Sequence, residues 1–178
     1  MRNFIKIIPV LFCISLFGCS FLTSKPTENI SFGFHLGDAE QKPDYLEELK
    51  DYSIYEWVTK GESIDNWIEL VTIENFTLTP YLPKAPEDMM NVTKAKIKKR
   101  CPNVKWNIIK NQNKSILYEW RIQGCPSEPD QNEIGRFVDG NWNRWRIAFA
   151  AKGKELSKDK REKWIKDLSK ATIKQTRR

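Results

Sequence analysis

The chain has 178 residues, with 30 Lys or Arg, 23 Asp or Glu and one His, and a formal net charge of +7. Hydrophobic residues make up 40% of it and aromatic residues 12%, which excludes an intrinsically disordered chain and suffices for the core of one domain. Its single histidine, His35, gives poor support for a catalytic triad or a histidine-rich metal site. We therefore expect a protein without catalytic activity, bound metal or cofactor.

Residues 1–18 have the pattern of an export signal, with a short basic head before an apolar stretch that is too short to span a bilayer as a helix. The stretch ends in the motif LFGC at 16–19, which resembles the lipobox of bacterial lipoproteins, although Phe17 stands where that family usually has a small residue. The resemblance implies that residues 1–18 are a removable signal peptide and that Cys19 carries palmitate-type acyl chains. The alternative is an ordinary signal peptide in which Cys19 has no special role.

Two or more acyl chains on one residue hold a protein at a bilayer effectively permanently. Ser20 is not the Asp that retains enteric lipoproteins at the inner membrane, so the resemblance implies an outer-membrane anchor with the domain facing the periplasm. Export makes nucleic acid an improbable partner. We expect the membrane itself to be one partner, and an envelope protein or an anionic envelope component to be another.

The chain after the signal divides by composition into two parts. Residues 19–43 are rich in Ser, Thr, Pro, Gly and Asn without a sustained period, which predicts a tether, and residues 44–178 predict a single α+β domain. The stretch YLEELKDY at 45–52 is consistent with a helical turn or a short helix. The stretches 53–58 and 66–76 predict a first pair of strands.

A helix is predicted at 86–100, because Pro86 suits a first helical position and acidic and basic residues occupy its first and last turns respectively. Two further hairpins follow, and the second turns around Asp139-Gly140-Asn141. Ser157 is expected to cap a C-terminal helix near 157–172. The fold class predicted is α+β, with an antiparallel sheet of about four to six strands and two helices. Strands of the two later hairpins are expected at 104–109, 115–122, 133–138 and 144–151.

This order of elements loosely resembles the PsbP-like fold. The stretches EWVTKGESIDNWIELVTI, NEIGRF and REKWIKDL also resemble a group of uncharacterised proteobacterial secreted proteins. The resemblance to PsbP-like proteins implies an accessory or binding role.

Removing the signal and committing Cys19 to lipid leaves two cysteines, Cys101 and Cys125. An oxidising periplasm allows them only one pairing, so we expect a structural disulfide.

Charge is distributed unevenly along the chain: residues 28–90 hold 14 acidic and 4 basic side chains, whereas residues 91–178 hold 9 acidic and 23 basic. One interpretation is that the two halves fold together and neutralise each other. The other is a basic binding surface on the strand NWNRWRIAF and the C-terminal helix. The candidate residues of that surface are Arg144, Arg146, Lys163, Lys166 and Lys170; the two arginines are equally consistent with an ion-paired sheet face.

The leading functional hypothesis is a lipid-anchored, non-enzymatic binding or accessory protein of the cell envelope. The alternative is an inhibitor or immunity protein against a toxin or a cell-wall lytic enzyme. An enzyme acting on glycan is a third hypothesis, which requires two carboxylates facing each other across a cleft.

Overall fold

The structure is a computed structural model that describes residues 27–34, 42–153 and 155–176. The expected signal peptide 1–18, the candidate lipidation residue Cys19 and the single histidine His35 lie outside the described residues. In chain order the elements are β1 (Thr27–Ser31), β2 (Tyr45–Glu48), β3 (Tyr52–Val58), β4 (Glu69–Thr77), α1 (Pro86–Arg100), β5 (Lys105–Gln112), β6 (Ser115–Ile122), β7 (Gln131–Asp139), β8 (Asn143–Lys152), α2 (Lys158–Lys170) and β9 (Thr172–Thr176).

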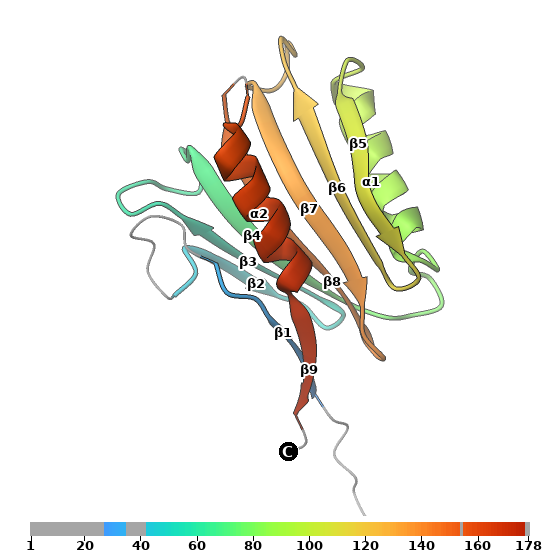
Figure 1. Cartoon of the computed structure of the whole chain (residues 1–178). Coiled ribbons are helices and arrows are strands. Elements are labelled where there is room, and N and C mark those ends of the chain that lie inside the picture. The colour runs from blue at the N-terminus through green and yellow to red at the C-terminus, as the bar shows by residue number, and fades with distance from the viewer. Residues whose placement is uncertain (1–26, 35–41, 154, 177–178) are drawn as a thin grey trace, which may run out of the picture.

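Seven of these strands form one antiparallel sheet in the order β2-β3-β4-β8-β7-β6-β5 (Figure 1). The three predicted hairpins, β3–β4, β5–β6 and β7–β8, are all present. The β4–β8 pair joins the first half of the chain to the second through nine paired positions, from Glu69 with Ala151 to Thr77 with Asn143. The two halves of the sheet are therefore joined at its centre by strands that lie far apart in the sequence.

The predicted fold class, α+β with four to six strands, is wrong, because the described residues form a mostly β structure with nine strands and only two helices. The stretch at 45–52 is not helical; its residues form β2 and the start of β3. So short a stretch is too short for a stable helix, while the edge of β3 pairs with β2 at four positions. The other unpredicted strands are β1 and β9.

Both predicted helices are confirmed, and the local signals explain their ends. Pro86 opens α1, and the Asp88 carboxylate accepts a hydrogen bond from the Ala85 backbone N–H at 3.0 Å. The Ser157 hydroxyl accepts one from the Lys160 N–H at 3.3 Å, as its capping role predicts.

One helix packs on each face of the large sheet (Figure 1). On the α2 face, the Trp164 ring stacks on Phe149 with centroids 4.1 Å apart. On the α1 face, Met90 and Ile97 pack over β6 and β7. The core of the α2 face comprises Val71, Leu117, Ile134, Ile147, Phe149, Ala151, Trp164, Leu168 and Ala171.

Strands β1 and β9 pair antiparallel to form a separate two-stranded ribbon, from Thr27 with Thr176 to Ser31 with Thr172. Phe32 and Phe34 then pack against the core of the α2 face. Residues 27–34, which the sequence places in a tether, are thus part of the folded domain.

Cys101 and Cys125 are joined by the predicted disulfide, with their Cα atoms 5.5 Å apart. It links the C-terminal end of α1 to the loop between β6 and β7. Of the helices that the structure describes, neither is long and apolar enough to cross a membrane.

Candidate functional site

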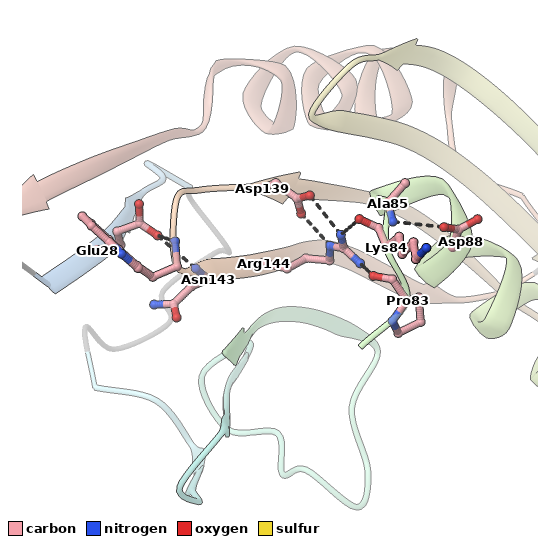
Figure 2. Close-up of polar contacts among 9 residues, drawn as sticks. Glu28, Pro83, Lys84, Ala85, Asp88, Asp139, Asn143 and Arg144 are labelled. Carbon is pink, nitrogen blue, oxygen red and sulfur yellow. Dashed lines mark hydrogen bonds and ion pairs between the residues drawn. The ribbon is translucent and has the colours of Figure 1, made fainter. Parts of the chain in front are cut away.

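Arg144, a member of the predicted basic surface, is completely buried. Its guanidinium donates to both carboxylate oxygens of Asp139, at 2.5 and 2.9 Å, and to the backbone carbonyls of Pro83 and Lys84, at 2.7 and 3.2 Å (Figure 2). A buried guanidinium needs this many acceptors because it has lost its water. Arg144 therefore fastens the start of β8 to the loop before α1 and is not part of an exposed surface.

Arg146 is also largely buried, with 14% of its side chain exposed. It forms ion pairs with Glu74 at 2.5 Å and Glu133 at 2.8 Å, and it donates to the Tyr118 hydroxyl at 3.0 Å. Burial by itself lowers the pKa of this guanidinium, but Glu133, Tyr118 and Glu74 raise the pKa well above its ordinary value. Arg146 is thus permanently charged and already neutralised within the fold.

The three lysines of the predicted surface, Lys163, Lys166 and Lys170, are exposed on α2. They lie on the other face of the sheet from Arg146, which lines a groove beside α1. Strand alternation places both arginines on one sheet face, but only the fold brings in the distant acids and carbonyls that surround them. The five residues do not form one surface.

The α1 face of the sheet contains an open groove of about 530 Å³ between α1 and the strands that α1 leaves uncovered. We call it the α1 groove. The sheet contributes both aromatic and acidic side chains, and α1 contributes a rim of three apolar residues and three polar or basic ones, the latter being Thr93, Lys96 and Arg100. Its lining includes Tyr52, Ile54, Glu56, Leu70, Thr72, Glu74, Phe76, Glu133 and Arg146 from the sheet and Met89, Val92, Thr93, Lys96 and Ile97 from α1.

Acidic side chains outnumber basic ones on the floor of the α1 groove, where Glu56, Glu74 and Glu133 surround the single cation Arg146. Desolvation raises the pKa of the Glu56 carboxyl, and the Thr72 hydroxyl, which donates to it at 3.1 Å, opposes that rise. Glu74, a second floor carboxylate, lies on β4 and accepts a hydrogen bond from the Tyr52 hydroxyl at 2.9 Å. Glu56 is therefore the floor acid with the fewest internal partners.

Tyr118 reaches this network because β7 has a glycine directly beneath its ring. A Cβ atom on Gly135 would collide with the Tyr118 ring and hydroxyl. The hydroxyl donates to Glu133 at 3.0 Å, and burial raises its pKa, so it stays protonated as a donor. Gly135 and Tyr118 hold Glu133 and Arg146 in fixed positions.

The arrangement is suited to binding rather than to proton transfer. Arg146, Glu74, Glu133 and Tyr118 satisfy one another, so their hydrogen-bonding capacity is largely used inside the protein. Glu56 retains acceptor capacity next to the apolar walls of the groove. Such a site fits a ligand segment that is mostly apolar and has a hydrogen-bond donor.

The sequence did not single out Glu56 and Glu74, which line the groove. The available signal is their position in the middle of apolar strand patterns, where a charged side chain usually has a buried partner. Glu119, a strand acid among basic residues on the other face of the sheet, accepts hydrogen bonds from Arg161 of α2 at 2.6 and 2.7 Å. Its hydrogen bond from Arg161 lowers the pKa of its carboxyl.

Within the described ranges, no group of three or more His, Cys, Asp or Glu side chains is placed to hold a metal ion. The chain matches no protein-family model, no curated protein and no solved structure. The resemblances to bacterial lipoproteins, to the PsbP-like fold and to the proteobacterial secreted proteins stay predictions.

Proposed function

We propose that the protein is a lipoprotein of the bacterial cell envelope, anchored through acylated Cys19, that binds another envelope component in the α1 groove. The role is accessory and non-enzymatic. The observation that carries the proposal is the groove itself: an open, partly apolar recess of about 530 Å³ whose floor is held rigid by the Arg146 network. Binding sites of this kind combine an apolar wall with a few fixed polar groups.

Three further features support the proposal. The LFGC motif places a thiol where lipoproteins are acylated. The Cys101–Cys125 disulfide suits an oxidising compartment. On the rim of the groove, Val92 has 41% of its surface exposed and so offers an apolar contact to a ligand.

The anchor is tested in cells supplied with labelled palmitate. We expect the label to enter the wild-type protein and to be absent from Cys19→Ser, which should leave the membrane fraction. Equal labelling and equal fractionation of the two proteins would contradict the anchor.

The groove is tested by a photo-crosslinking amino acid introduced at Val92 on its rim or at Leu46, which is 51% exposed on the opposite sheet face. We expect a discrete adduct from position 92 and none from position 46 in intact cells. Leu70→Lys on the groove wall should abolish the adduct. An adduct of the same size from both positions, or one that survives Leu70→Lys, argues against the groove as the binding site.

A further inference from the structure

One end of the molecule gathers three segments that are far apart in sequence: the free end of the β1–β9 ribbon, the turn between β7 and β8, and the loop between β4 and α1 (Figure 1). We call it the ribbon end, and it includes Thr27, Thr176, the turn at 140–142 and the loop at 78–84. The N-terminal part of the chain, which contains Cys19, continues from Thr27. Whatever holds Cys19 therefore acts on this end of the domain.

The ribbon is firmly attached to the β7–β8 turn through Glu28. This buried carboxylate accepts hydrogen bonds from the backbone N–H groups of Asn141 at 2.7 Å, Trp142 at 3.1 Å and Asn143 at 3.1 Å; Figure 2 shows it beside Asn143. A Cβ atom on Gly140 would collide with the Glu28 carboxylate, so the turn requires glycine there.

The loop before α1 is attached to the same turn. The Leu78 N–H donates to the Trp142 carbonyl at 2.7 Å, and Arg144 binds the carbonyls of Pro83 and Lys84 (Figure 2). The ribbon end is thus one rigid surface, because buried charged groups connect its three segments.

This surface presents two aromatic side chains to solvent. Tyr81 is 96% exposed and Trp142 is 41% exposed. Tyrosine and tryptophan are the side chains enriched at membrane–water interfaces, where the ring contacts apolar groups and the polar atom stays hydrated. Exposed lysines accompany them at this end, whereas two of its acids are engaged, Asp139 by Arg144 and Asp88 at the start of α1. The lysines are Lys84, Lys114 and Lys174.

A recess of about 500 Å³ lies beside Trp142, between β1 and the ends of β4 and β8. Amide and hydroxyl side chains line it, among them Asn29, Thr77 and Asn141. The buried side-chain oxygen of Asn75, another lining residue, has no hydrogen-bond partner among the described residues. A recess with amide and hydroxyl groups next to an exposed indole ring can accept the polar groups of a phospholipid headgroup.

Chain length brings this end to the bilayer. Thr27 follows Cys19 by eight residues, a span of at most about 30 Å when fully extended and typically about 15 Å for a flexible chain. We propose that the ribbon end, through Trp142 and Tyr81, docks on the headgroup region of the phospholipid bilayer in which Cys19 is anchored. This inference rests on the proposed lipid anchor, and it sets the orientation of the α1 groove relative to the membrane.

The experiment supplies the tether chemically, so that docking is tested whether or not cells acylate Cys19. The chain 19–178 contains every described residue, and with Cys101 and Cys125 joined, Cys19 is its single free thiol. It is coupled through Cys19 to a maleimide lipid in vesicles of phosphatidylethanolamine and phosphatidylglycerol. Brominated acyl chains in the same vesicles then quench tryptophans that lie at the interface.

We expect wild-type fluorescence to be quenched and Trp142→Phe to lose about half or more of the quenchable signal. The matched control is Trp67→Phe, which should keep it. Trp67 lies against Lys152, at the other end of β8 and roughly 30 Å from Trp142 along a ten-residue strand.

Tyr81→Trp provides a second variant at a site too exposed to affect folding, and its quenching should exceed that of the wild type. Equal quenching of the wild type and Trp142→Phe, or no gain in Tyr81→Trp, overturns membrane docking. Absence of labelled palmitate from the protein in cells overturns the anchor instead, and the two failures are therefore distinguishable.

Discussion

The two faces of the large sheet are built from the same strands but differ in chemistry. The α2 face is a continuous apolar core, in which Trp164 and Leu168 cover Ile147 and Phe149. The α1 face is covered only over β6 and β7, and its open part carries the Glu74–Arg146–Glu133 network. Both faces thus carry a buried apolar cluster, but only the α1 face also keeps buried charges beside an open groove.

Buried ion pairs are weak evidence for stability, because desolvation offsets much of their attraction. Their presence on the α1 face is better explained by a requirement for fixed polar groups at a binding site. On this view, the α2 face is most sensitive to the loss of side-chain volume, whereas the open part of the α1 face is most sensitive to the loss of a charge. Four predictions test this contrast.

The largest effect is expected from Phe149→Ala on the α2 face. Phe149 is fully buried and stacks on Trp164, so its removal leaves a cavity and should lower the free energy of unfolding by about 4 kcal/mol. Urea denaturation measures this change. Val92→Ala on the exposed rim of α1 is the control and should change the value by less than about 0.5 kcal/mol. A loss below about 1 kcal/mol in Phe149→Ala would contradict the assignment of this face as a tightly packed core.

Arg146→Met on the α1 face comes next. It leaves Glu74 and Glu133 largely buried without a counterion and should cost about 3 kcal/mol at pH 7, measured in the same way. Adding Glu74→Leu and Glu133→Leu should recover most of that loss, because no unpaired charge then remains. If the triple variant is as unstable as the single one, the arginine acts through packing rather than through charge.

Removing the disulfide should reduce the local stability of α1 more than that of α2. Replacing both Cys101 and Cys125 by Ser is expected to lower the free energy of unfolding by about 2–3 kcal/mol, because the unfolded chain loses a constraint. In native-state hydrogen exchange, the C-terminal turns of α1 should lose protection more than α2 does. Equal loss in both helices would show that the disulfide does not specifically hold α1 on its face.

The smallest expected effect is on the pH dependence of stability, to which one carboxyl on each face contributes with opposite sign. The Glu119 carboxyl, whose pKa Arg161 lowers, stabilises the fold above its ordinary value of 4.5, and this contribution is lost as pH falls through the lowered pKa. The Glu56 carboxyl, whose pKa desolvation raises, binds protons more tightly when folded, so its contribution weakens as pH rises from about 4.5 through the raised pKa. Melting temperatures of Glu119→Gln and Glu56→Gln against pH measure both.

We therefore expect Glu119→Gln to lower the melting temperature at pH 7 but not under strongly acidic conditions. Glu56→Gln should leave it unchanged or raise it at pH 7. Parallel pH profiles of the two variants would remove this electrostatic difference between the faces.

Much of the secondary structure could be predicted because its signals are local. Pro86 and Ser157 mark helix starts, and Asp139-Gly140-Asn141 marks a hairpin turn. The missed strands β1, β2 and β9 have four or five residues each and little apolar alternation. Strands β1 and β9 pair with each other across most of the chain, as Ile30 does with Ile173, so neither strand has its partner nearby in the sequence. Strand β2 pairs with its neighbour β3, but its four residues are all exposed and show no apolar face.

The candidate site was less predictable. Strand alternation correctly places Arg144 and Arg146 on one face, but their burial depends on partners such as Pro83 and Glu74, which lie 61 and 72 residues away in sequence. The idea that the acidic and basic halves neutralise each other is supported by the ion pairs Glu74–Arg146 and Glu69–Lys160, each of which joins the two halves. The α1 groove has no counterpart in sequence, since it arises where α1 covers part of a sheet.

The sequence by itself determined the two helices, the three hairpins, the cysteine pairing and the prediction of an anchor at Cys19, because each depends on residues near one another or on counting. Only the tertiary structure decided the β4–β8 pairing, the β1–β9 ribbon, the burial of both arginines and the open groove. Those features depend on which distant groups meet, and desolvation acts on a charge only after the fold has removed its water.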